Sequence, residues 1–446
     1  MQSPADFTLN EVIIITPAQP KHVVITSLVG ELTIYENIQL PYLTGMIMIR
    51  DDNRIYDGIN INGTEILAIS LLSTFEDAKV ITKYFHIHHV ATTAKVGDNV
   101  EVLAIKLIES NGFNNSAISV NQAYSGTPDI IIKKILGDHL KFNAGGVAPI
   151  TPLYTGIQGP AVKPVQEPMK VVVPNMSPFQ ACDWICRTMT TTLGMPYYLY
   201  STLNGQNLQL RSFEEMLTQE VWNAKVPYVY SVAHAQNSSG SPSDMVMNVT
   251  NFGTQNSENV LRLLNNGSIG SDVGITDITT GQQVQYHFNI DLVFEELVNS
   301  GIINADERPI HHSAYRTFAR DNIAQLNNYN VNKTIATDTY LGFNNYGEQT
   351  NSAKLRLQSV HTAIRQLMNK SAINFTVNGM PYTSFSNAGV GRKVRFEYSA
   401  NDANNPGEKD KKRSGDYVIY SARHHFSITD QRHTVDIHGV KLGNPR

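Results

Sequence analysis

The first quarter of the chain alternates short β-type runs with turns. Runs rich in branched and aromatic residues are separated by the turn-forming pairs Asp57-Gly58, Asn62-Gly63 and Gly97-Asp98. Six strands at this spacing are typical of a β-sandwich or a β-barrel. The predicted strands cover residues 21–28, 32–39, 44–50, 65–73, 84–92 and 101–109.

One of these strands is apolar at every position of the run Met46-Ile47-Met48-Ile49. A strand with one face in water alternates apolar and polar residues, whereas here both faces are apolar and are expected to be buried against other residues. Met46 and Met48 are expected on one face, and Ile47 and Ile49 on the other. The cover comes either from another part of the same chain or from a second copy, and the pattern leaves both open. These four residues are therefore the candidate interface with a second copy or another partner.

The middle of the chain changes to helical signals. Thr127-Pro128-Asp129 combines a cap, a first-turn proline and an acid, and predicts a short buried helix over residues 130–136. Ser177 and Gln180 have capping-box spacing, and an apolar stripe predicts a helix that continues to Leu193. A hairpin is expected around Asn204-Gly205.

Residues 231–285 are polar and fit no element clearly, while the end of the chain returns to β character. Helices are expected near residues 313–327 and 352–369. Residues 401–415 are expected to form a charged loop. Strands are expected at 373–377, 393–398, 416–426 and 433–442. The predicted domains are 1–112 (β), 113–230 (mixed α+β), 231–350 (polar, irregular and helical) and 351–446 (β with a leading helix).

Composition narrows the functional classes. The 446 residues include 17% charged residues and carry a formal net charge of −4, which argues against a protein that grips nucleic acid through its overall field. No apolar run approaches the roughly 20 residues of a membrane span. No signal peptide is recognised, so synthesis in a reducing cytoplasm is expected.

Candidate metal and catalytic residues are few. His86 and His88 share a strand face and could begin a metal site, but a third ligand is missing, and polar strand residues are the alternative. Cys182 and Cys186 lie four apart on the helix stripe, where two small side chains facing the core are expected. No common hydrolase, nucleotide or zinc-protease motif occurs. We therefore expect no catalytic residues, no metal and no cofactor.

The stretch from Tyr35 to Leu71 resembles the N-terminal domain of the baseplate hub proteins of contractile-tailed phages, the T4-like tail hub family. The residues that carry the resemblance are Gly45, Met46, Met48, Asp51, Gly63, Glu65 and Ile66. The C-terminal strand pattern over residues 391–442 is similar to the second β domain of that family. The helix over residues 177–189, followed by a hairpin, is similar to its middle domain.

The resemblance implies a β-rich α+β multidomain protein with two tube-like β-barrel domains joined by mixed domains. It implies a structural virion protein of the tail baseplate, a homotrimeric hub that closes into a pseudo-sixfold ring. The ring would join the tail tube to a central spike, contact other baseplate proteins and let DNA pass without specific binding. A related hub occurs in the spike proteins of type VI secretion. The alternatives are a tail-associated cell-wall hydrolase and a glycan-binding tail module.

Overall fold

The computed structural model describes most of the chain. The described residues are 6–16, 22–52, 54–59, 61–73, 80–97, 100–140, 157–165, 168–205, 207–230, 247–255, 260–277, 281, 283–304, 307–309, 331–337, 352–368, 372–380, 389–399 and 408–445.

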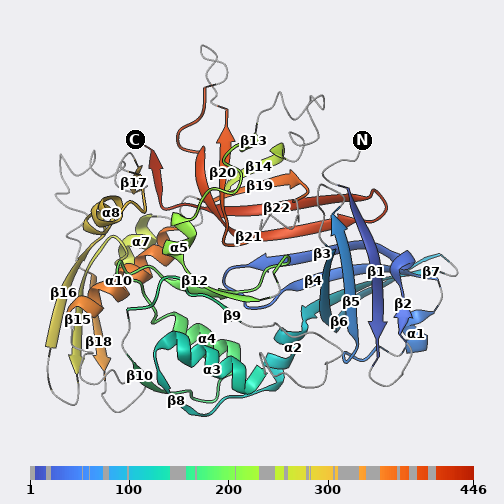
Figure 1. The fold of residues 1–446 in the computed structure, drawn as a ribbon, viewed down its shortest axis with the longest axis horizontal. Helices are drawn as coiled ribbons and strands as arrows, with labels where there is room; N and C mark the ends of the chain where they lie inside the picture. Colours follow the sequence, from blue (N-terminus) through green and yellow to red (C-terminus); the bar gives the residue numbers. More distant parts are fainter. Residues whose placement is uncertain are drawn as a thin grey trace.

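A 13-stranded sheet dominates the structure, and both ends of the chain contribute to it (Figure 1). Its main path runs in the order β14-β19-β22-β21-β3-β4-β7-β6-β5-β1-β2, and β20 and β13 branch from β21. The N-terminal strands are β1 (Phe7–Ile15), β2 (Val23–Val24), β3 (Val29–Asn37), β4 (Thr44–Asp51), β5 (Ile66–Ser73), β6 (Val80–Gly97) and β7 (Val100–Glu109). The later strands are β13 (Tyr228–Tyr230), β14 (Val249–Gln255), β19 (Ala372–Asn378), β20 (Lys393–Tyr398), β21 (Gly415–Ser427) and β22 (Arg432–Val440).

The two β-rich ends of the chain meet along β3 and β21. These strands pair antiparallel over seven residue pairs, from Glu31 opposite Ser427 to Asn37 opposite Ser421. We call β1–β7 the N-terminal unit and β19–β22, with β13 and β14, the C-terminal unit. One hydrophobic core continues from the first unit into the second, since Phe7 and Phe426 pack with ring centroids 5.0 Å apart.

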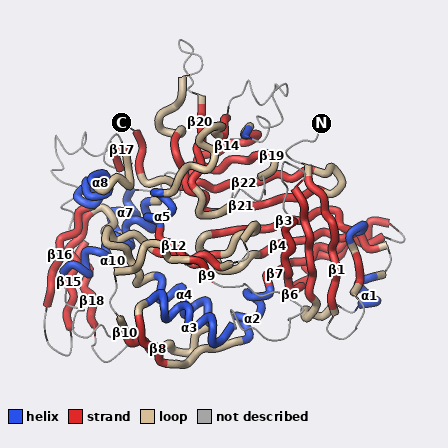
Figure 2. Tube along the Cα trace, viewed as in Figure 1, coloured by secondary structure: helices blue, strands red, loops and turns tan. Residues whose placement is uncertain are grey.

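A middle unit has its own core beside the large sheet (Figure 2). Its helices are α2 (Ser110–Ala117), α3 (Pro128–Leu140) and α4 (Pro178–Cys186), with α5 (Phe213–Thr218) at its end. Its strands are β8 (Ala123–Gly126), β9 (Ile157–Gln158), β10 (Met169–Val172), β11 (Tyr197–Tyr200) and β12 (Leu208–Ser212). Helix α4 begins at Ser177 with a capping box to Gln180, as the sequence predicts.

A smaller three-stranded sheet lies at the opposite side of the molecule from β1 (Figure 1). It contains β15 (Gly270–Asp277), β16 (Gln283–Asn289) and β18 (Val331–Thr337). The neighbouring helices are α7 (Val260–Asn265), α8 (Ile290–Asn299) and α10 (Ser352–Leu367). The remaining elements are η1 (Thr26–Leu28), α1 (Ile55–Ile59), β17 (Glu307–Pro309) and β23 (Gly443–Pro445).

The predicted β-rich α+β class is confirmed, and so are most of the later strands, helix α10 and the hairpin of β11 and β12. The two separate tube-like barrels are not confirmed, because the described strands pair into one branched sheet that joins both units. The four domain boundaries stay a prediction.

Several local predictions were wrong. Residues 21–28 form only the short strand β2 and the turn η1, where the Thr26 hydroxyl accepts a hydrogen bond from the Val12 N–H at 2.8 Å. Strand β1 was not predicted at all. Helix α4 ends at Cys186 and not at Leu193. The stretch 231–285 contains β14, α7, β15 and the start of β16. The helix predicted at 313–327 lies outside the described residues, as do residues 401–407 of the loop predicted at 401–415.

The close packing of β3 and β4 explains why the second residue of β4 is a glycine, Gly45. A Cβ added there would lie 2.8 Å from the Thr33 carbonyl oxygen, so the close approach of β3 and β4 leaves no room for a side chain. Gly253 on β14 has nothing within 4 Å of an added Cβ.

We therefore expect Gly45→Ala to lower the free energy of unfolding by about 1–3 kcal/mol, because the backbones of β3 and β4 must separate. Gly253→Ala is the matched strand control and is expected to be neutral or slightly stabilising. Urea unfolding of both variants measures this difference. Equal midpoints for the two variants would contradict the close approach.

Candidate assembly surface and junction

The candidate interface on β4 divides between two environments. Ile47 and Ile49 are buried in the chain's own core, where each stabilises the fold by roughly 1.5–3 kcal/mol. Met46 and Met48 point to the other face and are half-buried. The same chain therefore covers one face of this strand. Contact of Met46 and Met48 with another chain stays a prediction.

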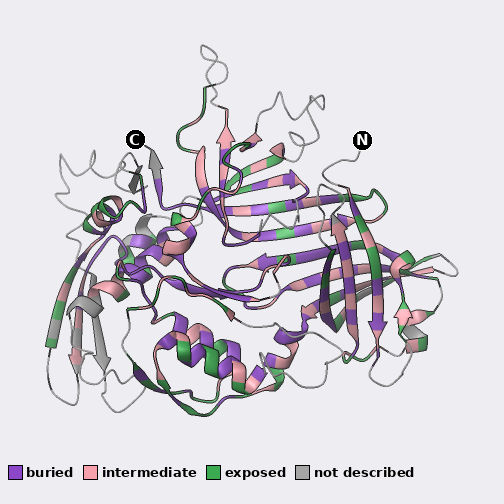
Figure 3. Ribbon diagram, in the orientation of Figure 1, coloured by how far each residue is buried: buried purple, intermediate pink, exposed green. Residues whose placement is uncertain are grey.

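Met46 and Met48 belong to a partly exposed face of the large sheet, which we call the outer face. Met46 lies opposite Lys106 of β7, and Met48 lies opposite Glu31 of β3. Across the β3–β21 seam the same face continues to Tyr35 opposite Arg423. Buried residues alternate with intermediate or exposed ones along β4 in Figure 3. The outer face is therefore a mixture of thioether, aromatic and oppositely charged groups.

A groove of about 600 Å³ lies on the outer face at the seam of the two units. Tyr35 and Thr44 line it from the N-terminal unit, and Arg423 and His438 line it from the C-terminal unit. His438 Nδ1 lies 2.6 Å from Asn374 Oδ1, which holds the ring against the neighbouring strand. The groove exists only because β3 and β21 bring residues from both ends of the chain together.

Behind the seam, a buried carboxylate ties three segments together. Glu36 of β3 is 2% exposed and accepts hydrogen bonds from the backbone N–H groups of Leu203 and Val390. His424 of β21 places its Nε2 at 3.6 Å from the same carboxylate, and its Nδ1 lies 3.3 Å from His433 Nε2. Glu36 therefore fixes the middle unit and the loop before β20 against the seam.

A second buried carboxylate holds the same loop of the middle unit from the other side. Glu109 Oε2 accepts from the Leu43 N–H at 2.9 Å and from the Ser201 hydroxyl at 3.3 Å. Lys83 Nζ lies 3.6 Å from Glu109 Oε1 and donates to the carbonyls of Thr202 and Gly205. Because this pair is almost fully buried, its charges and donors are satisfied only while the loop stays in place.

The histidines and cysteines of the sequence have mainly structural surroundings. His86 stacks on Phe113 with ring centroids 4.1 Å apart, whereas His88 is exposed. Cys182 and Cys186 are buried thiols in the core of the middle unit, as predicted, and burial raises the pKa of Cys186 to about 12. Within the part of the chain that the structure describes, no three His, Cys, Asp or Glu side chains are grouped to hold a metal.

Helix α10 carries a buried imidazole that the sequence analysis did not single out. His361 is 5% exposed, and burial together with the charges of Arg365 and Arg187 lowers its pKa to about 3. Its Nε2 has no hydrogen-bond partner among the described residues. The ring is therefore neutral in the folded chain at ordinary pH.

Comparison with known proteins gives a match in fold. No protein-family model matches the sequence, and no curated protein matches it. The chain is similar to the crystal structure of a tail protein from Neisseria meningitidis MC58, with 12% identity, a TM-score of 0.52 and coverage of 98% of this chain and 97% of that one. At this identity the match shows that both chains share a fold over nearly their whole length.

Two other solved structures match this chain at lower TM-scores. One is a 43 kDa tail protein of prophage MuSo2 from Shewanella oneidensis, at 9% identity, TM-score 0.49 and coverage of 98% and 100%. The other is the E. coli c3393 protein, a type VI secretion component described as similar to the T4 tail proteins gp27 and gp5, at 8% identity, TM-score 0.42 and coverage of 94% and 74%. No helix among the described residues is long and apolar enough to cross a membrane.

The buried Lys83–Glu109 pair predicts that removal of Lys83 lowers the free energy of unfolding far more than removal of an exposed arginine does. Lys83→Met leaves Glu109 charged and buried without its partner, which is expected to cost about 3–5 kcal/mol of unfolding free energy. Arg187→Met breaks the exposed ion pair with Asp183, and we expect a loss below about 1 kcal/mol. Urea unfolding compares them, and similar losses would show that the buried pair does not hold the junction.

His361 predicts a pH dependence of stability. Because its pKa is about 3 in the folded chain and about 6.5 when exposed, the unfolded chain binds the proton first. The stabilisation is complete above about pH 6.5 and declines by up to about 1.4 kcal/mol per pH unit as pH falls toward 3. His361→Gln is expected to remove the contribution of one proton from the pH slope of the unfolding free energy. Urea unfolding at pH values from 7 to 4 measures this slope.

His22→Gln is the control, because His22 is exposed. If both His361→Gln and His22→Gln keep the pH slope of the unfolding free energy of the unmodified chain, His361 is not the group that causes this slope.

Proposed function

We propose that this chain is a structural protein of a contractile phage tail, the hub of its baseplate. Three copies would close into a pseudo-sixfold ring that joins the tail tube to a central spike and leaves a channel for DNA. The observation that carries the proposal is the shared fold with a tail protein over nearly the full length of both chains. In this proposal the chain has no reaction of its own.

The arrangement of the two β-units suits such a ring. Each chain supplies an N-terminal and a C-terminal unit side by side, so three chains would supply six units. Seven residue pairs along the seam and the buried Glu36 oppose hinging between the units. A rigid double unit would keep its spacing when a neighbouring ring of the tail tube binds to it.

One end of the large sheet is the natural place for contact between copies. Its main path ends at β2 and β14, but a bridge joins Asn248, next to β14, to Val229 of β13 in the same chain, which leaves β2 as the open end among the described strands. Exposed strand edges favour pairing with another chain unless they are covered. In the proposed ring a neighbouring copy would cover β2, and the outer face with Met46 and Met48 would meet the tail tube, the spike or another baseplate protein.

The charge of the chain agrees with passage of DNA and not with its capture. The whole chain has a net charge of −4, and on the outer face the cations Arg50, Lys106 and Arg423 are interspersed with Glu31 and Asp436. Phosphate contacts dominate protein affinity for DNA, so a wall without an excess of cations would let DNA slide. Neither alternative, a cell-wall hydrolase or a glycan-binding module, is supported by a specific contact among the described residues.

The proposal predicts the mass of the assembled protein. Light scattering of the full chain over a concentration series, with the central spike protein present and absent, is expected to give three copies of this chain per particle. A monomer at all concentrations, with the spike also present, would contradict the ring.

A variant of the outer face tests the role of Met48. Met48→Lys is expected to weaken association with the chain's own copies or with the spike by about tenfold or more, because a charge enters an apolar contact. The isolated chain should stay folded, since Glu31 lies directly opposite. Leu292→Lys, at a 61% exposed position on α8, is the control. Unchanged association of Met48→Lys in both mixtures would remove Met48 from the interface.

A further inference from the structure

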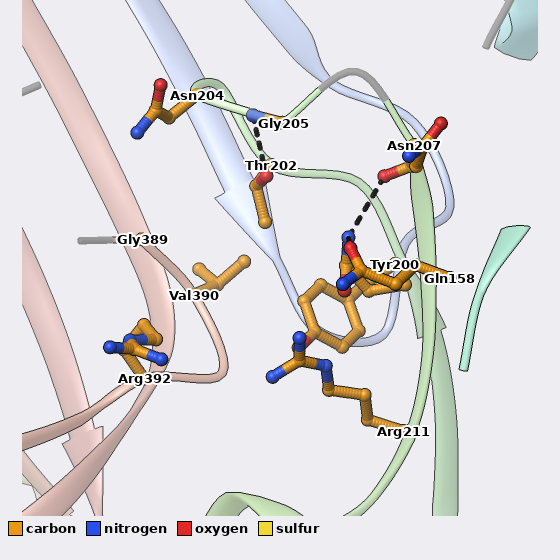
Figure 4. A pocket seen from close by; sticks show the side chains of 11 residues that line it. Gln158, Tyr200, Thr202, Asn204, Gly205, Asn207, Arg211, Gly389, Val390 and Arg392 are labelled. Atoms are coloured by element: carbon orange, nitrogen blue, oxygen red, sulfur yellow. Dashed lines mark hydrogen bonds between the residues drawn. The ribbon is translucent and has the colours of Figure 1, made fainter. Parts of the chain in front are cut away.

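A small polar pocket lies where the hairpin of the middle unit meets the loop before β20. Its volume is about 90 Å³, too small for a cofactor and sufficient for an oxyanion or a few waters. Arg211 of β12 and Arg392 of the loop before β20 line two sides of it, and Figure 4 shows Tyr200 beside Arg211. We call this the arginine pocket.

The two arginines lack a carboxylate partner within the described part of the chain. Arg392 Nη1 donates to the neutral Gln219 Oε1 at 3.3 Å, while its Nε is buried and has no hydrogen-bond partner there. The nearest acids are engaged elsewhere: Glu36 accepts from the Leu203 and Val390 backbone, and Glu215 accepts from the Val162 N–H.

The electrostatics of the pocket favour an anion. Burial and the nearby Arg211 charge both lower the pKa of Arg392, which means that the two cations repel each other. Burial raises the pKa of Tyr200 to about 12, so its hydroxyl is neutral and does not compensate that charge. An anion between the guanidinium groups would relieve this repulsion and accept their hydrogen bonds.

Gln209 also lines the pocket, and its side chain includes an acceptor without a hydrogen-bond partner among the described residues. Gln209 is 8% exposed, and its Nε2 donates to Gln158 Oε1 at 3.0 Å. This bond fixes the amide so that Gln209 Oε1, which is buried, has no partner among the described residues. A fitting ligand therefore combines negative oxygens for the arginines with one hydroxyl for Gln209.

We propose that the arginine pocket binds a small tetrahedral oxyanion that carries a hydroxyl, the class represented by inorganic phosphate. Hydrogen phosphate has the charge, the size and the proton that these groups require. Sulfate has the same shape and charge but no proton at neutral pH, so it leaves the Gln209 acceptor unpaired. A bound phosphate would connect the hairpin of the middle unit to the C-terminal unit. This inference does not depend on the proposed ring.

The test is calorimetric titration of the full-length protein with inorganic phosphate and with sulfate at pH 7.5 and constant ionic strength. We expect saturable phosphate binding at one site per chain, and binding of sulfate weaker by about 10- to 100-fold. Equal affinities would overturn the role of Gln209 and with it the proposed ligand class. Absence of saturable phosphate binding would show that the pocket holds water alone.

Variants locate the site. Arg211→Gln and Arg392→Gln are each expected to weaken phosphate binding by about tenfold or more, and Arg392→Lys should restore only part of it, because lysine lacks the planar fork. Arg187→Gln removes the same charge at an exposed position and should bind as the unmodified chain does. The urea unfolding midpoint of each variant shows whether that variant folds. If a variant does not fold, the comparison of phosphate with sulfate binding in the unmodified chain tests the proposal. Phosphate binding unaffected in folded Arg211 and Arg392 variants would overturn the assignment.

Discussion

The pairing of β3 with β21 is the constraint on which the rest of the structure depends. Thr33 and His425, which lie on these strands, are 392 residues apart in sequence, and their side chains are 3.2 Å apart in the fold. The β3–β21 pairing joins the two β-rich ends into one sheet, creates the groove on the outer face and positions Glu36 behind the seam. Such a distant pairing forms late, after the intervening chain has been made, and is costly in loop-closure entropy.

Buried charges make that pairing specific. Glu36 and Glu109 approach the same loop, at residues 201–205, from two strands of the N-terminal unit. Burial of a carboxylate is expensive unless its oxygens accept hydrogen bonds, and here backbone N–H groups, a hydroxyl and Lys83 supply them. A shifted register would leave these groups unsatisfied. The network therefore favours one relative position of the units.

Much of the local structure could be predicted from the sequence, because local signals decide it. The capping box at Ser177, the Asn204-Gly205 hairpin and the alternation in β22 each depend on residues close in the chain. Strand β1 could not be predicted in the same way, since its pattern is completed by pairing with β5 some sixty residues away. The polar stretch 231–285 has strands whose apolar partners come from other segments, such as Phe252 against Phe396.

The candidate surface could be predicted only in part. The apolar run on β4 correctly predicted a strand, but not which pair of residues enters the core. The seam, the groove and the arginine pocket gave no signal, because Glu36, Arg211 and Arg392 read as ordinary polar residues until the fold brings them together.

The central claim is that three copies of this chain form one ring wall with two β-units each. Electron cryomicroscopy of the chain assembled with its spike tests it most directly. The account predicts threefold symmetry, a central opening and six β-units around it, with β3 and β21 paired within every copy. A reconstruction in which the copies do not enclose an opening, or in which the two units of one chain separate, would contradict it.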